Sequence, residues 1–376
     1  MNNSHIPKTM HGVLLTGHGG LDNLEYRDNL AVPVPASNEV LIRVGATAIN
    51  NTDINTRTGW YSKTITSGRG EGAEAGFGKS SSQQDSSWSG KPLRLPRIQG
   101  ADVCGTIVAV GRDVHPSRIG ERVLVRPMQQ SPDNTDSHHL ITFGSECDGG
   151  YAQYTVARST EVFAINSGLS DVQLASFPCA YSTAEGMLER ASLKANEKIL
   201  ITGASGGVGS AAVQLAKRRG AHVIAVCAEA KRADILNMGA DEVIARERPL
   251  REQIETESIH VVADLVAGTE WPALLDVLIR GGRYVVSGAI AGPMVSLDVR
   301  TLYLKDLTFF GATWQPRHVF ENLIGYIERD EIRPIVAKTY SLNEVAQAQR
   351  DFIGKRFSGK LAIAVGDAAD TPRETK

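Results

Sequence analysis

The 376-residue sequence lacks the features that mark several classes of protein. Its cysteines, Cys104, Cys147, Cys179 and Cys227, form no Cys-x-x-Cys pair, so they match neither a zinc knuckle nor a disulfide framework. No apolar run approaches the roughly 18 residues of a membrane span, and the first residues do not resemble a signal peptide. The formal net charge is −2 without a long basic run, which argues against nucleic-acid or membrane-surface partners. We therefore expect a cytoplasmic protein in a reduced setting.

The chain is too long for one compact core, so two domains are expected. Short Val-rich stretches bounded by Gly or Pro dominate the first part and predict β-strands. From about Lys198, apolar strands alternate with helical segments, which predicts a parallel, doubly wound sheet of six strands. One helix is expected over residues 271–282 (WPALLDVLIRGG), before the strand RYVVSGAI.

Residues 62–90 interrupt the β-rich part with a stretch that is rich in Gly and Ser and nearly free of aliphatic side chains. A segment of this composition cannot bury itself, so a flexible insertion is predicted. The alternative is a mobile lid over a functional site.

The segment ITGASGGVG, residues 201–209, joins the first strand of the predicted sheet to its first helix. Its glycines allow a tight turn that approaches a pyrophosphate closely, and the helix that follows offers free N–H groups. The spacing is Ala204-x-Gly206-x-x-Gly209, with Ala in the first glycine position. Between a strand and a helix, this motif predicts dinucleotide binding.

The end of the second strand indicates which dinucleotide is bound. NAD-binding proteins usually have an acidic residue there, which holds the ribose 2′-hydroxyl. This chain has Cys227 and Ala228, followed by Glu229, Lys231 and Arg232. A missing acid and two nearby cations suit the 2′-phosphate of NADPH. Alternatively, both cations simply begin the next helix in solvent, and Glu229 is a partial argument for NADH.

The stretch AINNTDINTRTGWY, residues 48–61, concentrates polar side chains after an alternating strand but contains no Cys, His or Glu. Asn50 carries an amide that could bond to the ribose of the cofactor or to a substrate oxygen. Asp53 fits a structural role, capping the following turn through its carboxylate. The stretch is therefore a candidate active-site wall without a metal.

Six segments together resemble the medium-chain dehydrogenase/reductase superfamily: AINNTDIN, IQGADVCGTIVAVG, ECDGGYAQY, FPCAYSTAEGML, GASGGVGSAAVQLA and FSGKLAIAV. The resemblance implies an α/β architecture, in which a Rossmann domain interrupts a GroES-like β domain. We place the GroES-like catalytic domain at residues 1–168, the Rossmann domain at 169–314, and the return to the catalytic domain, with a frayed tail, at 315–376. The resemblance also implies a homodimer through paired Rossmann edge strands, with residues 299–312 as the candidate region.

Zinc alcohol dehydrogenases of this superfamily have Cys, His and Cys at positions that correspond here to Asn50, Ala101 and Cys179. One thiolate cannot hold a catalytic Zn²⁺, which needs about three protein ligands. The four closely spaced cysteines of the structural-zinc lobe are also missing from the sequence. We expect no metal site.

The pattern N-x-x-D-I-N-x-x-x-G-x-Y is similar to that of zinc-free quinone reductases and mitochondrial-type enoyl-thioester reductases. Tyr61 matches the proposed proton donor of the latter group, and its unperturbed pKa of about 10 would keep it protonated at neutral pH. Alternatively, Tyr61 only stacks on the nicotinamide or caps the pocket. Thr52 takes the position of a relay hydroxyl in zinc dehydrogenases, so the catalytic candidates are Tyr61, Asn50 and Thr52. The cofactor-binding candidates, from the turn, the second strand and the resemblance, are Thr183, Ser205, Gly206, Gly207, Val208, Gly209, Lys231, Arg232, Ala267, Gly288 and Ala289.

The predicted activity is a zinc-independent, NADPH-dependent reduction of a small electrophile, namely a quinone, an enone or an enoyl thioester. Reduction of a C=C bond conjugated to a carbonyl depends less on a Lewis acid, because hydrogen-bond donors can stabilise the enolate oxygen and a side chain can supply the proton. The alternatives are an alcohol or aldehyde dehydrogenase of the same superfamily, and a non-catalytic NADPH-binding protein.

Overall fold

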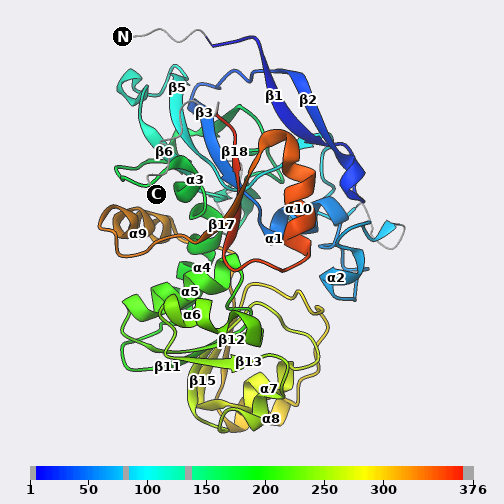
Figure 1. The fold of residues 1–376 in the computed structure, drawn as a ribbon, viewed down its shortest axis with the longest axis vertical. Coiled ribbons are helices and arrows are strands. Elements are labelled where there is room, and N and C mark those ends of the chain that lie inside the picture. The colour runs from blue at the N-terminus through cyan, green and yellow to red at the C-terminus, as the bar shows by residue number, and fades with distance from the viewer. Residues whose placement is uncertain (1–5, 79–83, 132–137, 367–376) are drawn as a thin grey trace.

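The computed structural model describes residues 6–78, 84–131 and 138–366, so the predicted frayed tail beyond Gly366 lies outside the described residues. The molecule has two lobes, which lie one above the other in Figure 1. The chain begins in the upper lobe, forms the lower one and then returns to the upper lobe. None of the described helices is long and apolar enough to cross a membrane.

The upper lobe is rich in β-structure, as its Val-rich segments predict. Its main sheet has seven strands, in the order β10-β6-β5-β3-β18-β17 with β9 paired to β3; a three-stranded sheet, β2-β1-β4, and the pair β7-β8 accompany it. These strands are β1 (Thr9–Leu15), β2 (Leu24–Ala31), β3 (Glu39–Ala48), β4 (Arg97–Ile98), β5 (Cys104–Val110), β6 (Arg122–Val125), β7 (Met128–Gln130), β8 (Leu140–Thr142), β9 (Tyr154–Arg158), β10 (Val162–Ala164), β17 (Val336–Ser341) and β18 (Lys360–Ala364).

Helices and short 3-10 turns connect these strands and lead into the lower lobe. The helices are α1 (Asn51–Thr58), α2 (Arg69–Gly72), α3 (Asp171–Leu174), α4 (Pro178–Arg190), α9 (Arg317–Glu328) and α10 (Val345–Ile353). In the described ranges of both lobes the 3-10 turns are η1 (Leu21–Asn23), η3 (Pro116–Arg118), η4 (Ser159–Glu161), η5 (Glu229–Lys231), η6 (Leu250–Glu252) and η7 (Leu342–Glu344).

The last strand positions the candidate active site. β18 runs antiparallel to β3, with Ala362 opposite Ala48. The ladder continues past the end of β3, because the backbone N–H of Ile49 donates to the carbonyl of Leu361 at 2.9 Å. Residues from the C-terminal part of the chain therefore lie directly beside the stretch 48–61.

The lower lobe contains one parallel sheet of six strands, which confirms the predicted doubly wound fold. The strand order is β13-β12-β11-β14-β15-β16, so the order reverses between β11 and β14. At such a point a crevice opens at the carboxyl ends of the strands, where open α/β sheets bind ligands. The elements are β11 (Lys198–Ile201), α5 (Gly207–Arg218), β12 (His222–Cys227), α6 (Arg232–Asn237), β13 (Glu242–Ala245), β14 (Ile259–Asp264), α7 (Trp271–Asp276), β15 (Leu278–Val286), α8 (Val299–Leu304) and β16 (Thr308–Gly311).

The predicted helix over residues 271–282 is wrong in its second half. The helix α7 ends at Asp276, and β15 begins two residues later, at Leu278. Leu278 pairs with Ile259 of β14, and after an irregularity the register resumes with Arg283 opposite Val261. The apolar residues Leu278 and Ile279 satisfy helical spacing and strand alternation equally, and sheet pairing decides between them.

The described part of the insertion 62–90 is held against both lobes, although its residues 79–83 lie outside the described ranges. From α1, the fully buried Arg57 donates to the carbonyl of Ala73. The backbone N–H of Arg69 donates to the carbonyl of Ile290 in the lower lobe at 3.1 Å. The segment does not bury itself; partners outside the insertion provide the contacts that its own side chains lack, and its flexibility stays a prediction.

Candidate active site and nucleotide cleft

A cleft of about 680 Å³ between the lobes brings nearly all of the predicted site residues together. The catalytic candidates Asn50, Thr52 and Tyr61 line its upper wall. Its other walls contain the predicted cofactor-binding residues Thr183, Ser205, Gly206, Gly207, Val208, Gly209, Lys231, Ala267, Gly288 and Ala289.

The predicted phosphate-binding turn has room only for small residues. Gly206 precedes the first residue of α5, and Gly203 has a φ of +60°, which side chains rarely adopt. A Cβ at Gly209 would lie 2.3 Å from the carbonyl oxygen of Gly203, so a side chain there would force the turn open. The turn therefore presents the start of α5 to the cleft, a shape that fits the pyrophosphate of a dinucleotide.

A buried carboxylate fixes the loop after β14. Asp264 accepts hydrogen bonds from Thr202 Oγ1 at 2.6 Å and from Tyr284 Oη at 2.7 Å. It also accepts from the backbone N–H groups of Val266 and Ala267. Ala267, in the left-handed region at φ +52°, is thereby held against the cleft, where its small side chain leaves space for a flat ring.

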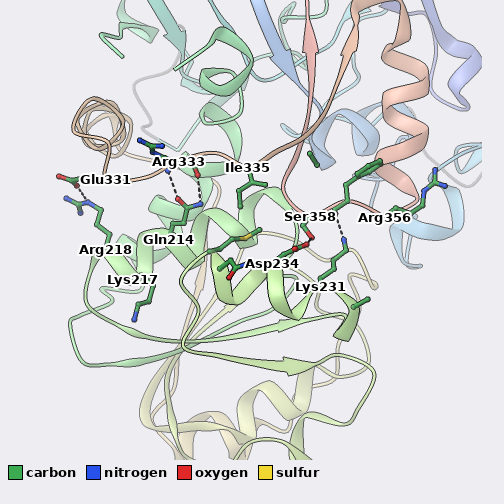
Figure 2. A pocket seen from close by; sticks show the side chains of 15 residues that line it. Gln214, Lys217, Arg218, Lys231, Asp234, Glu331, Arg333, Ile335, Arg356 and Ser358 are labelled. Carbon is green, nitrogen blue, oxygen red and sulfur yellow. Dashed lines mark hydrogen bonds and ion pairs between the residues drawn. The ribbon is translucent and has the colours of Figure 1, made fainter. Parts of the chain in front are cut away.

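The two cations after β12 differ in placement. Lys231 lines the cleft and also a more open groove of about 1,010 Å³ behind it, which Figure 2 shows. Its Nζ donates to the carbonyls of Lys355 and Phe357 at 2.9 and 2.6 Å. Arg232 does not line the cleft; its guanidinium is bonded to the carboxylate of Glu229. In this structure Arg232 therefore lies outside the cleft, its predicted contact with the cofactor stays a prediction, and its pairing occupies the acid that argued for NADH.

Two other arginines line that end of the cleft and were missed from the sequence. Arg246 and Arg248 follow β13 and lie among the lining residues. Burial and, next, the charge of Arg246 lower the pKa of Lys231, so these two cations are near neighbours. The run RERPLR directly after the third strand was the available signal, because the carboxyl ends of adjacent parallel strands share one edge of the sheet.

The amide of Asn50 is fully engaged by the protein itself. Its Nδ2 donates to Asp102 Oδ2 at 2.7 Å, and its Oδ1 accepts from Lys360 Nζ at 2.6 Å. Lys360 and Asp102 form an ion pair at 3.0 Å, with side chains 2% and 0% exposed. Asn50 thus belongs to a buried network whose members already bond to its amide, and its predicted contact with the ribose or the substrate stays a prediction.

This network also fixes the elements around it. The other carboxylate oxygen of Asp102 accepts from the backbone N–H of Cys179, at the start of α4, at 2.6 Å. The stem of Lys360 packs against Gly207, where a Cβ would lie 2.8 Å from its Cδ. The ion pair therefore ties the active-site wall to the nucleotide turn. Sequence reasoning used the segments that contain Asp102 and Lys360 only as marks of resemblance.

Asp53, the third residue of α1, caps the start of this helix, as its position predicts. Its Oδ2 accepts from the backbone N–H of Asn50 at 2.7 Å. Burial, opposed by this hydrogen bond, raises the pKa of Asp53 to about 7. The carboxyl group is fully enclosed and does not line the cleft, so its contacts are those of a helix cap.

The three positions that correspond to zinc ligands have unsuitable chemistry for a cation. Ala101 offers no donor atom, and the amide oxygen of Asn50 already accepts from Lys360. Burial and then the carboxylate of Asp102 raise the pKa of the Cys179 thiol well above its usual range, which disfavours a thiolate. Within the described ranges, no group of three or more His, Cys, Asp or Glu residues is placed to hold a metal.

Tyr61 and Thr52 form a hydroxyl pair in the upper wall of the cleft. Tyr61 Oη donates to Thr52 Oγ1 at 3.3 Å, and Trp88 Nε1 donates to the same oxygen at 2.8 Å. Burial, as the largest cause, raises the pKa of Tyr61 above its usual value, so the phenol is neutral at physiological pH. A hydroxyl oxygen accepts two hydrogen bonds, so the two donors leave Thr52 its own proton to give to a ligand.

Trp88 is the unexpected member of this wall because it comes from the Gly/Ser-rich insertion. Its ring lies 5.2 Å from that of Tyr61, and the Trp60 ring lies 5.9 Å from Tyr61 on edge. All three line the cleft. A single tryptophan in a segment otherwise almost without large apolar side chains was the sequence signal for a contact at a site.

Two family matches cover the two halves of this architecture. Residues 36–167 match the alcohol dehydrogenase GroES-like domain, and residues 207–329 match the zinc-binding dehydrogenase domain. The chain is 29% identical to the acryloyl-coenzyme A reductase of Metallosphaera sedula, over 94% of this chain and 99% of the relative. It is 27% identical to the quinone oxidoreductase of Homo sapiens, over 95% and 98%. The crystal structure of a candidate alcohol dehydrogenase from Sinorhizobium meliloti 1021 is 43% identical, with a TM-score of 0.85 over 97% of this chain and 99% of that one.

Proposed function

Since the chain belongs to the medium-chain dehydrogenase/reductase superfamily, and is thus of an oxidoreductase family, we propose that it is an NADPH-dependent reductase that uses no zinc. Its substrates on this proposal are quinones, enones or enoyl thioesters, in which a C=C bond is conjugated to a carbonyl. The relatives named as a quinone oxidoreductase and an acryloyl-coenzyme A reductase support this choice of substrate class.

The observation that carries the proposal is the hydroxyl pair in the cleft. At the zinc-ligand positions the chain has a buried lysine–aspartate network instead of a donor set for a metal. Beside it, Tyr61 and Thr52 face the same cleft as the nucleotide turn, with the Thr52 proton left over for a ligand. Hydrogen-bond donors without a Lewis acid suit an enolate oxygen better than an unactivated ketone.

A nicotinamide bound in this cleft supplies a hydride. The residues of the chain then have separate tasks. Thr52 donates its hydrogen bond to the oxygen on which negative charge develops. Tyr61, kept protonated by burial, holds the proton that reaches the substrate directly or through Thr52. Trp60 and Trp88 bound the space beside the phenol, where they exclude water and favour flat substrates.

The preference for NADPH rests on the charges at the adenosine end of the cleft. Ala228, Lys231, Arg246 and Arg248 all line it there. Ala228 at the end of β12 replaces the acid of NAD binders, and Glu229 is paired with Arg232 away from the cleft. Glu247 also lines this end, but it is paired with Arg246 at 3.2 Å. Lys231 and Arg248 therefore remain as the cations that favour the 2′-phosphate.

The proposed partner is a second copy of the same chain. Next to the edge strand β16, exposed apolar side chains gather between residues 294 and 304: Met294, Val295, Leu297, Val299, Tyr303 and Leu304. An apolar stretch beside an unpaired strand edge suits sheet-to-sheet pairing. Light scattering of the purified protein tests this, with Leu304→Glu expected to release monomers; a monomeric parent protein contradicts it.

The function is tested by NADPH oxidation in chelator-treated protein, with a quinone, a simple enone and a 2-enoyl thioester as acceptors. We expect turnover on at least one of them, and none on unactivated aldehydes or ketones. Binding of NADPH without turnover on any acceptor would instead indicate a non-catalytic protein. A rate that depends on added zinc would indicate a carbonyl-reducing dehydrogenase.

A further inference from the structure

Arg69 stands apart among the buried charges of the molecule. The residue is only 4% exposed, and it lines the cleft. Neither Nε nor Nη1 has a hydrogen-bond partner, and no carboxylate in the described residues pairs with it. Burial alone lowers the pKa of this guanidinium to about 10, yet at neutral pH it keeps its charge. A buried, unpaired charge is costly, so a missing anionic partner is the simplest explanation.

The insertion holds Arg69 in a fixed place. Its backbone N–H is bonded to Ile290, and the adjacent Gly68 packs so closely on Ala291 that a Cβ would lie 3.0 Å from the carbonyl oxygen. On the other side, Arg57 anchors the carbonyl of Ala73, just after α2. The guanidinium is therefore presented by a bridge between the lobes rather than by a free loop.

A second cation lies near it. Lys355 lines the same cleft; its Nζ stands 4.2 Å from the centre of the Phe352 ring, and Asn51 is its nearest polar contact, at 3.5 Å. Lys355 as a residue is exposed, but its ammonium is held against the Phe352 ring. Desolvation there, then the charges of Arg69 and Lys231, lower its pKa to about 7, and solvent at the exposed side of the residue makes this the lower bound. The charges that act on Lys355 are all positive. Lys231, Lys355 and Arg69 thus form a series from the adenosine end of the cleft toward α1.

The groove of Figure 2 shows the opposite arrangement. There Arg218 pairs with Glu331, and Ser358 bonds to Asp234. Lys217 pairs with Asp241, which does not line the groove. Apart from Lys231, which lines both the groove and the cleft, the cations of the groove are paired with acids of the chain, so among the described residues the groove offers no unpaired cation of its own to an anionic ligand. Compared with the groove, the cleft is therefore the place where cations lack an acidic partner in the described part of the chain.

We propose that Arg69 and Lys355 form a phosphate-binding subsite, through which the insertion 62–90 takes part in ligand binding. Nη2 of Arg69 can form a fork with either Nε or Nη1, so one edge of the guanidinium can hold two oxygens of one phosphate group, and Lys355 can approach a third. The phosphate comes either from the pyrophosphate of the dinucleotide or from a phosphorylated thioester such as a coenzyme A ester. The subsite deepens the proposed function, on which the second source rests, but phosphate binding is measurable without turnover.

The test compares Arg69→Met with Lys63→Met, an exposed charge of the same insertion that does not line the cleft. Dissociation constants are measured by fluorescence or calorimetry for NADPH, NADH, coenzyme A and phosphate-free pantetheine. If the cofactor is the source, Arg69→Met weakens NADPH and NADH equally, by about tenfold or more, which corresponds to about 1.4 kcal/mol. If a thioester is the source, Arg69→Met weakens the binding of coenzyme A alone and leaves the binding of pantetheine unchanged. Lys63→Met leaves the dissociation constants of all four probes unchanged.

Two further variants keep the test decisive. Arg69→Lys preserves the charge and should recover part of the affinity, and Lys355→Met should weaken the same ligand as Arg69→Met. If Arg69→Met does not fold, Lys355→Met carries the comparison alone. Unchanged affinity for all four probes in the folded variants overturns the subsite, whatever the outcome of the acceptor assays.

Discussion

Lys360 and Arg69 are both nearly buried cations that line one cleft, yet their surroundings are opposite. Lys360 donates to Asp102, Asn50 and the carbonyl of Ile49. Two nitrogens of the Arg69 guanidinium have no hydrogen-bond partner among the residues that the structure describes. Lys360 comes from a strand in the main sheet, whereas Arg69 comes from an insertion rich in Gly and Ser.

This difference indicates that Lys360 belongs to the framework of the fold and that Arg69 belongs to a binding surface. A buried charge that is fully paired stabilises one arrangement of the backbone, and removing one partner leaves the other uncompensated. A buried charge without a partner lowers the stability of the fold, but it raises the affinity of the protein for an anion that binds beside it. The same reasoning divides the polar side chains beside the cleft. The amide of Asn50 and the carboxyl group of Asp53 bond to other groups of the protein, whereas the hydroxyl of Thr52 keeps a proton to donate.

The largest expected effect is on the paired cation. Lys360→Met leaves Asp102 buried without its counter-charge, so we expect the free energy of unfolding to fall by about 3–5 kcal/mol. Urea denaturation measures this. The control is Lys217→Met, whose ion pair with Asp241 is about one third exposed and should contribute no more than about 1 kcal/mol. Equal losses in the two variants would contradict the framework role of Lys360.

Tyr61→Phe should leave the fold and NADPH affinity unchanged and slow turnover at least about tenfold. The phenol supplies the proton, and losing a general acid typically costs 10²–10⁴-fold, roughly, with a smaller loss if Thr52 draws on water instead. Steady-state rates and NADPH titration check both halves. Tyr303→Phe, at an exposed position, is the control. An unchanged rate would leave Tyr61 with only a packing role against Trp88.

Much of this architecture was visible in the sequence, because it depends on local patterns. The six strands of the lower sheet follow from apolar runs, and the nucleotide turn from glycines between a strand and a helix. The cleft network was not visible, because Asn50 meets residues 52 and 310 positions away in the chain. Composition did not indicate that residues 62–90 contact the site. Backbone carbonyl groups, the aromatic side chain of Trp88 and the charged side chain of Arg69 attach that segment to it.

The unpaired cations should make ligand binding sensitive to pH. In the free protein the pKa of Lys355 is lowered from 10.5 to about 7, so the side chain loses its proton as the pH rises past 7. A bound phosphate favours the charged form and raises that pKa again, so affinity should fall with rising pH. Between pH 6 and 8 the fall should reach roughly tenfold, since each pH unit above the pKa removes about nine tenths of the remaining protonated form.

NADH is the suitable probe for this pH series, because it lacks the titrating 2′-phosphate. Lys355→Met should flatten the profile, although Lys231, whose pKa burial also lowers, can leave a residual slope. Arg69 keeps its charge over this range. A parent profile that is already flat would mean that no phosphate of the cofactor meets Lys355.

The smallest expected effect concerns Arg232, which the sequence placed at the cofactor and the structure pairs with Glu229 outside the cleft. Arg232→Ala should change the dissociation constant of NADPH less than about twofold, the usual scale for an exposed ion pair. Arg248→Ala is the matched comparison, because Arg248 lines the cleft and has no ion pair among the described residues. That variant should weaken NADPH more than NADH. If Arg232 proves the stronger determinant instead, the side chain must leave Glu229 when the 2′-phosphate binds, and the division between paired and unpaired cations would not hold at this end of the cleft.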